Sequence, residues 1–309
     1  MSTIGAIQAA LAKNAVPNQN FGHYSKPGQT TKTMRSAPLL GFSTLGNPTA
    51  SLREGCELAR RFGLEFIELR ALHGTTDLPS VFDSQEFESC QDISVRLMAS
   101  SLRLRDYGQQ DLEAFCKLAA LADRMGAPYI RIFGAGGIAF GPEPGADLLR
   151  SLAQGVRHIR QILEAGRHRC GLLLETHDIF SSSARCLALN EYLDEPLNVL
   201  WDSHHTWRLS GESPEETWIA LGPYIRHIHY KDSVASPTSA EGWRYVLPGD
   251  GEFPSERLAR LLRNENYTGG VSLEWEKMWH PDLPPIEKAL GLFRQRFTSL
   301  EAPPSAHLS

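Results

Sequence analysis

The chain has 309 residues, of which 41% are hydrophobic and 22% charged, and this composition is typical of an ordinary globular protein. A formal net charge of -5 and an isoelectric point of about 6.1 exclude a strongly basic surface, so non-specific nucleic-acid binding is not expected. The five cysteines form no CxxC pair, which argues against a zinc ribbon or a disulfide framework and favours a reducing, cytoplasmic location.

Residues 1–37 differ from the rest of the chain because most of them are polar and rich in Gly, Pro, Asn and Gln. We expect an N-terminal arm or disordered extension there. The segment contains no basic stretch followed by a long apolar run, so no signal peptide is predicted. No stretch of the chain approaches the roughly 20 apolar residues that span a bilayer. Residues 38–300 are predicted to form one domain, and 301–309 a C-terminal tail.

From Pro38 onward, short apolar runs alternate with longer amphipathic segments. We expect strands at Leu39–Ser43, Leu64–Leu69, Ile93–Ala99, Tyr129–Phe133, Gly171–Glu175, Val199–Trp201, Ile225–Tyr230 and Val271–Trp275. Helices are expected between them, for example at Ser51–Phe62, Leu112–Met125, Leu148–Ala165 and Pro254–Asn264. At the first of these, Ser51 followed by Glu54 predicts a capping box.

Eight strands that alternate strictly with eight helices predict parallel strands joined by helical crossovers. An open, doubly wound sheet is the competing architecture. Eight units in about 260 residues match the usual size of a closed barrel, and no linker divides the chain into halves. The pattern therefore favours an α/β fold, a single (β/α)8 TIM barrel with an N-terminal extension.

Ionisable residues stand near the ends of four late strands. These residues are Glu175, Asp202, His229 and Glu274, and side-chain alternation puts each on the inward face of its strand. His227 shares the face of His229, and Glu276 shares the face of Glu274. A single strand-end acid is more often a helix N-cap or a salt-bridge partner, and a single buried histidine is more often a core residue. Four such residues at one rim would bury unpaired carboxylates together, and a bound metal ion is the simplest compensation.

The chain resembles the xylose isomerase-like TIM-barrel superfamily of sugar isomerases and epimerases. The resemblance covers residues 39–297 and rests on five segments: Leu173-Leu-Glu-Thr-His177, Trp201-Asp-Ser-His-His205, His227-Ile-His-Tyr-Lys-Asp232, Leu247-Pro-Gly-Asp-Gly251 and Tyr267-Thr-Gly-Gly-Val-Ser-Leu-Glu-Trp-Glu276. It implies one divalent metal ion held by Glu175, Asp202, His229 and Glu274. Glu276 stays open as the alternative to Glu274, because both face inward. Three carboxylates and one imidazole suit Mn²⁺, Mg²⁺ or Co²⁺ and do not exclude Zn²⁺.

The function implied by this resemblance is a metal-dependent isomerase or epimerase of a sugar or sugar-like small molecule. Glu175 and Glu274 would then be catalytic, moving a proton next to a carbonyl by way of an enediolate. A lyase of the keto-inositol dehydratase type begins with the same proton abstraction and remains an alternative, as does a non-catalytic sugar-binding barrel. The DNA-repair branch of the superfamily uses additional histidines on early strands, which this chain lacks. Barrels of this group often associate, so a homo-oligomer is expected by resemblance.

Seven further residues are candidates for substrate binding: Glu68, Arg70, His73, Arg131, His177, His205 and Lys231. Arg131 either pairs with a carboxylate such as Glu68 or Glu175 or binds a carboxylate, phosphate or hydroxyl of the substrate. As an alternative to substrate binding by Lys231, Lys231 and Asp232 pair with each other or cap the loop that follows.

Two loops also bear on function. The long segment Ser233–Glu252, which contains Trp243 and Tyr245, is expected to be a lid or a structural cover over the rim. The GxGxxA pattern at 134–139 follows a strand, but Pro142 and Pro144 prevent the helix that a dinucleotide-binding fingerprint needs at once. A nucleotide cofactor is therefore not predicted.

Overall fold

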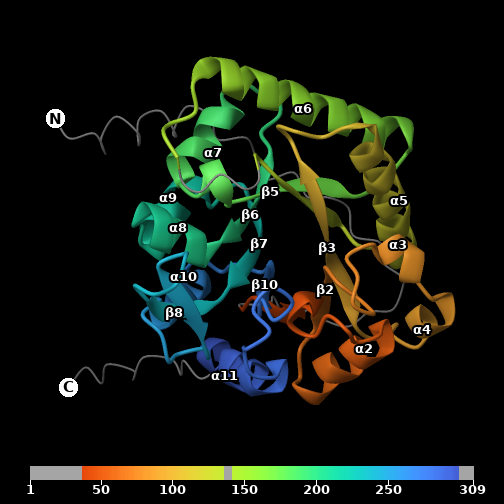
Figure 1. Ribbon diagram of the computed structural model, residues 1–309, viewed down its shortest axis with the longest axis vertical. Coiled ribbons are helices and arrows are strands. Elements are labelled where there is room, and N and C mark those ends of the chain that lie inside the picture. Colours follow the sequence, from red (N-terminus) through yellow and green to blue (C-terminus); the bar gives the residue numbers. More distant parts are fainter. Residues whose placement is uncertain (1–36, 136–140, 299–309) are drawn as a thin grey trace, which may run out of the picture. The chain divides into compact units, whose positions relative to one another are not determined.

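The computed structural model describes residues 37–135 and 141–298, and within them the predicted (β/α)8 barrel is confirmed (Figure 1). Eight parallel strands close in the order β1-β10-β7-β6-β5-β4-β3-β2. They are β1 (Leu39–Ser43), β2 (Phe66–Leu69), β3 (Ser94–Arg103), β4 (Tyr129–Phe133), β5 (Gly171–Glu175), β6 (Asn198–Asp202), β7 (Ile225–Tyr230) and β10 (Gly270–Leu273). Except for Ala37, the expected N-terminal arm lies outside the described residues, as do the C-terminal tail and most of the GxGxxA segment.

Helices follow the strands and surround the barrel (Figure 1). Their bounds are α2 (Leu52–Arg61), α3 (Leu78–Val81), α4 (Ser84–Glu88), α5 (Gln109–Met125), α6 (Ala146–Ala165), α7 (Ser183–Asn190), α8 (Ser203–Ser210), α9 (Pro214–Leu221), α10 (Ser255–Asn264) and α11 (Ile286–Thr298), with short 3-10 turns η1 (Thr44–Gly46) and η2 (Asp178–Phe180). The capping box of α2 is confirmed: Ser51 Oγ accepts from Glu54 N, and Glu54 Oε2 accepts from Ser51 N. Within the described residues, no helix combines the length and the apolar character of a membrane span.

Among the differences from the expected elements, two have a clear local cause or bear on the rim. The strand expected from Leu64 begins at Phe66, because Gly63 adopts φ +60° and Leu64 N still bonds the helix carbonyl of Ala59. The expected loop at 233–252 contains most of an antiparallel hairpin, β8 (Asp232–Ala235) with β9 (Trp243–Val246). This hairpin stands beside the C-terminal end of β7, so ordered backbone flanks the rim.

The interior of the barrel below the rim is apolar on the side of β3, β5 and β6. Leu97, Leu173 and Leu200 form a buried cluster, and Tyr129 packs against it. Leu173 and Leu200 each precede an acid by two residues, which places Glu175 and Asp202 on the same inward face, one layer higher. Glu175 and Asp202 therefore stand above packed apolar side chains, at the C-terminal end of the barrel.

Outward-facing strand residues pack against the helices. Ile130 and Ile132 of β4 and Leu172 and Leu174 of β5 belong to the large buried cluster that joins the strands to the helical layer. This layer fixes the strands, and so fixes the relative positions of side chains that point inward from different strands.

Candidate metal centre and substrate pocket

Four ionisable side chains meet at the C-terminal ends of β5, β6, β7 and β10. One ligand-type atom from each of Glu175, Asp202, His229 and Glu274 lies within 4.8 Å of all the others. His229 Nδ1 is 3.6 Å from Glu175 Oε1 and 3.3 Å from Glu274 Oε2. All four residues are buried, Glu274 being the most exposed at 7%. The fold thus brings together the four residues that the resemblance implied as metal ligands.

Asp202 has two functions at once. It is the N-cap of α8, and its Oδ1 accepts hydrogen bonds of 3.0 Å from the backbone N–H groups of His204 and His205. Its Oδ2 is buried, makes no hydrogen bond and belongs to the cluster side of the carboxylate. The capping role that a single strand-end acid usually has therefore uses one carboxylate oxygen of Asp202 and leaves the other facing the cluster.

His229 is held from below by Glu68. His229 Nε2 lies 2.7 Å from Glu68 Oε2, and the neighbouring His227 Nε2 bonds Ser272 Oγ at 2.7 Å. Burial by itself would raise the pKa of Glu68, but the charge of His229 and the hydrogen bonds of both histidines lower it to about 2. An ionised Glu68 only accepts hydrogen bonds, so His229 Nε2–H donates to it, and Nδ1 is the ring nitrogen that faces Glu175 and Glu274.

The donor set fits a divalent cation. His229 Nδ1 and Asp202 Oδ2 are both buried without a hydrogen bond, and both belong to the four-residue cluster, although Lys231 Nζ forms an ion pair with Asp202 Oδ2. Orphaned buried polar atoms are unfavourable unless something binds them. Carboxylate oxygens with one imidazole nitrogen are ligands that Mg²⁺, Mn²⁺ and Co²⁺ accept, and Zn²⁺ accepts them as well.

Lys231 neutralises the acids on the β10 side of the cluster. Its Nζ is 2.9 Å from Asp202 Oδ2 and 2.5 Å from both Glu274 Oε2 and Glu276 Oε1. Burial alone would lower the pKa of Lys231, but these three carboxylates hold it well above its ordinary value. Glu276 lies outside the four-residue group and also accepts from Tyr245 Oη at 3.1 Å. This geometry favours Glu274 over Glu276 as the ligand.

The interpretation that Lys231 and Asp232 pair with each other is wrong, because Lys231 forms its ion pairs with Asp202, Glu274 and Glu276. Asp232 instead accepts backbone N–H groups of Gly249, Gly251 and Phe253. It therefore caps the loop beyond the hairpin, which is the second role the sequence allowed.

Arg131 pairs with Glu175, one of the two alternatives that the sequence left open. Its Nη1 donates to Glu175 Oε2, and its guanidinium lies over the Phe133 ring, 3.9 Å from the centroid. Burial would raise the pKa of Glu175, but Arg131 holds it well below its usual range. Burial raises the pKa of Asp202 to about 6 despite the opposing charge of Lys231.

A cavity of about 130 Å³ opens above the cluster. It is lined by Leu45, Arg70, Arg131, Phe133, Glu175, His177, His205, Lys231, Glu274, Glu276 and Trp279. Five of the seven expected substrate-binding residues are therefore at the pocket. The other two are not: Glu68 is completely buried beneath His229, and His73 is exposed on the loop after β2.

The pocket includes residues that the sequence did not single out. Trp279 lines its mouth and is 52% exposed, which is unusual for so large an apolar side chain. Its position three residues after Glu276, on the loop that follows the last strand, is the signal that could have found it. Tyr245 of the hairpin also reaches the site, since its hydroxyl donates to Glu276.

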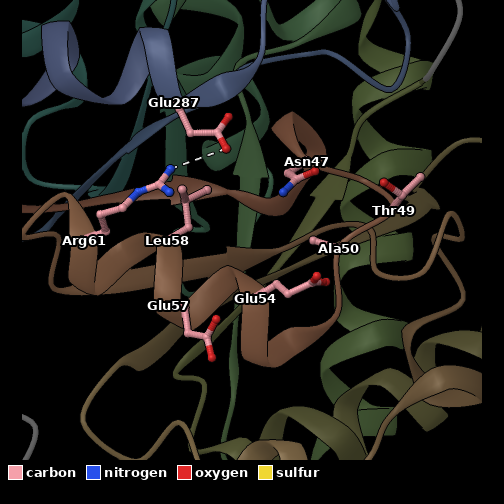
Figure 2. A pocket seen from close by; sticks show the side chains of 8 residues that line it. All are labelled: Asn47, Thr49, Ala50, Glu54, Glu57, Leu58, Arg61 and Glu287. Atoms are coloured by element: carbon pink, nitrogen blue, oxygen red, sulfur yellow. Dashed lines mark ion pairs between the residues drawn. The ribbon is translucent and has the colours of Figure 1, made fainter.

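A larger cavity of about 480 Å³ lies away from this centre, among residues of α2, α11 and the loop after η1 (Figure 2). Two of its three acids are already engaged. Glu54 closes the capping box with Ser51, and Glu287 lies 3.4 Å from Arg61, the pair joined by a dashed line in Figure 2. It offers no convergent set of ligands, so the smaller pocket at the barrel rim is the candidate functional site.

Fold and donor set together define a (β/α)8 barrel with a candidate metal centre at its C-terminal rim. Residues 56–296 match the family model described as the xylose isomerase-like TIM barrel, and the chain belongs to that family. A comparison with curated protein sequences found no match.

Solved structures share the fold. The probable 3-DHS dehydratase AsbF from Bacillus anthracis is 21% identical with a TM-score of 0.68, over 85% of this chain and 100% of its own. The IolI protein, solved with a zinc atom, is 15% identical with a TM-score of 0.67, over 84% and 97%. The 3-keto-D-glucoside 4-epimerase YcjR from E. coli is 13% identical with a TM-score of 0.59, over 79% and 98%.

Proposed function

We propose that this protein is a divalent-metal-dependent isomerase or epimerase that moves a proton next to a carbonyl in a small sugar-like substrate. The observation that carries the proposal is the convergence of Glu175, Asp202, His229 and Glu274 within 4.8 Å at the barrel rim. A pocket of about 130 Å³ directly above them suits a compact polar molecule. The epimerase among the structural neighbours has the same architecture and acts on a keto-glucoside, as its name states.

The four residues would hold the ion, and two of their donor atoms, Asp202 Oδ2 and His229 Nδ1, are buried without a hydrogen bond of their own. When bound, a divalent ion would polarise the substrate carbonyl and its adjacent hydroxyl and stabilise the negative charge that develops on proton removal. The donor set admits Mn²⁺, Mg²⁺ or Co²⁺, and Zn²⁺, which the IolI structure contains, is compatible too.

The chain supplies two carboxylates for proton transfer. Glu175 ends β5 and Glu274 follows β10, and in the barrel the strands β6 and β7 stand between them. Arg131 holds the pKa of Glu175 below its ordinary value, and the charges of His229 and then Lys231 do the same for Glu274, so both carboxylates are ionised at neutral pH. One carboxylate can then remove a proton from one side of the substrate while the other stands at the opposite side.

The stereochemical outcome follows from which group returns the proton. Removal by one glutamate and return by the other, at the same carbon, inverts that carbon and is an epimerisation. Return at the neighbouring carbon shifts the carbonyl and is an isomerisation. Arg131 contributes by fixing Glu175, since its own guanidinium is held against Phe133.

A lyase is the second candidate, and His177 is the observation that favours it. This side chain lines the pocket two residues after Glu175 and is 38% exposed. Its Nδ1 is 3.9 Å from Asp178 Oδ2, beyond hydrogen-bonding distance, so the ring is available to a ligand. A histidine here can protonate a departing hydroxyl, a step that elimination requires and epimerisation does not. AsbF, the probable dehydratase, shares the fold.

The test combines metal binding with isotope exchange. Purified protein is stripped with a chelator and titrated with Mn²⁺, and the loaded protein is then incubated with a panel of ketoses, aldoses and keto-acids in D₂O. Asp202→Asn is the test variant, and Asp147→Asn, an acid on α6 whose side chain is 98% exposed, is the matched control.

We expect the wild type and the Asp147→Asn control to bind one ion per chain and to introduce deuterium next to the substrate carbonyl. Asp202→Asn should lose both properties. A labelled product of unchanged formula supports isomerisation or epimerisation, whereas loss of water supports the lyase. Wild-type protein that neither binds a divalent ion nor catalyses exchange would overturn the proposal.

A further inference from the structure

Arg70 is a guanidinium at the pocket that has no acidic partner. It follows β2 directly and is half-buried. Its Nη1 donates to the Ala99 carbonyl at 3.2 Å and its Nη2 to Ser101 Oγ at 2.9 Å, both neutral acceptors. Over residues 37–135 and 141–298, no carboxylate forms an ion pair with Arg70.

The other two cations of the pocket are neutralised. Arg131 pairs with Glu175, and Lys231 contacts three carboxylates. A half-buried cation without a direct ion-pair partner is unfavourable, because neutral acceptors orient a guanidinium but do not balance its charge. Burial and the nearby charge of Arg131 lower the pKa of Arg70 to about 10, and the more distant charges of Glu175, Glu274 and Glu68 offset this only in part.

The position of Arg70 relative to the ligand cluster defines how a substrate would lie. In the closed barrel, β2 stands four strands away from β6 in either direction, so the strand of Arg70 is opposite that of Asp202. A molecule whose carbonyl is held at the cluster therefore extends across the mouth toward Arg70. The cavity volume of about 130 Å³ is well below the roughly 300–1,000 Å³ of pockets for drug-sized ligands, which limits that molecule to a small one.

We propose that Arg70 binds a carboxylate or phosphate group of the substrate, which makes the substrate a compact hydroxylated carbonyl compound that carries an acid. This inference rests on the proposed function of the same pocket and narrows its substrate class. Two Nη–H groups are used by Ala99 and Ser101, and this fixes the plane of the guanidinium. The remaining N–H donors are pre-oriented for an oxyanion, which a guanidinium binds in its plane through parallel hydrogen bonds.

The experiment measures preference for an anionic ligand by isothermal titration calorimetry at fixed ionic strength. The probes are three molecules of equal chain length: sorbitol, which is neutral, D-gluconate and sorbitol 6-phosphate. Titrations are run with Mn²⁺ and again after chelation. The variants are Arg70→Gln, which removes the charge, and Arg70→Lys, which keeps it. Arg103→Gln, an exposed arginine at the end of β3 outside the pocket, is the control.

We expect the wild type and Arg103→Gln to bind one of the two anions about tenfold or more tightly than sorbitol, which is the strength of one charge-assisted contact. Arg70→Gln should bind sorbitol as the wild type does but lose this preference, and Arg70→Lys should keep part of it. The tighter anion identifies the acid as carboxylate or phosphate. Unfolding temperatures of the variants check that the fold is intact.

Two results would overturn the inference. One is a wild type without preference for either anion over sorbitol, whether all three probes bind or none. The other is an Arg70→Gln variant that keeps the preference, because the anion then binds the metal or another group. Neither result affects Mn²⁺ binding or deuterium exchange, so failure here is distinguishable from failure of the proposed function.

Discussion

The role of Glu68 can be tested by replacing it with glutamine. The amide has nearly the same size and still accepts a hydrogen bond from His229 Nε2, which lies 2.7 Å from the present carboxylate. It lacks the negative charge, however, and it can rotate its NH₂ group toward the ring. His229 is then held less firmly with Nδ1 toward the other ligands, and that nitrogen is also less basic.

The expected magnitude follows from the geometry. Glu68 contacts only one of the four proposed ligands, so the other three donors stay in place. Loss of such a supporting carboxylate typically weakens metal binding about 10- to 100-fold, which is about 1.4–2.7 kcal/mol of binding free energy. The assay is competition between the protein and a chelator of known affinity for Mn²⁺ or Co²⁺.

The matched control is Glu276→Gln, the same substitution at a carboxylate near the cluster but outside the four-residue group. Its metal affinity should change much less than that of Glu68→Gln. If Glu68→Gln bound metal as tightly as the wild type while His229→Ala did not bind it, the reasoning that Glu68 positions His229 would be refuted. Circular dichroism of each variant separates loss of binding from loss of fold.

Two predictions concern stability. Gly41→Ala places a Cβ 2.5 Å from the Phe66 ring and backbone oxygen, so the free energy of unfolding in urea should fall by about 1–3 kcal/mol, and an unchanged value would contradict the described packing. Asp123→Asn should lower it by about 1 kcal/mol at pH 7, because the carboxylate binds Arg169 N–H and His168 Nδ1. Those bonds lower the pKa of Asp123 against the effect of burial. The stability difference between wild type and Asp123→Asn is therefore present above pH about 4 and shrinks as the pH falls further. A stability difference that grew in acid would refute this pH dependence.

Much of the architecture follows from the sequence, because it depends on short-range patterns. Apolar runs separated by amphipathic stretches specify strands and helices locally, and their strict alternation leaves a parallel barrel as the compact solution. Side-chain alternation along each strand also determines which residues face inward. For that reason Glu175, Asp202 and His229 could be assigned to one rim without coordinates.

The depth of an inward-facing side chain within the barrel, and the groups with which it pairs, depend on contacts between strands that are distant in the sequence. Alternation makes Glu68, Glu274 and Glu276 all inward-facing, and it gives no measure of height along the barrel axis. The register between β2 and β3 shifts at Glu68, which lies completely buried under His229 rather than at the mouth. The backbone N–H of Glu274 continues the strand ladder by donating to the Tyr230 carbonyl, whereas Glu276 lies beyond the ladder.

The charge pairing was likewise decided by the tertiary structure. The sequence offered Arg131 two carboxylates and Lys231 an adjacent aspartate, and it ranked none of them. In the barrel, Arg131 meets Glu175 from the next strand, and Lys231 meets acids from β6 and from the segment after β10. Arg70 is left without an acid for the same reason. Local pattern determines which groups turn inward, but ion pairing depends on distances across the closed barrel, which only strand register and closure set.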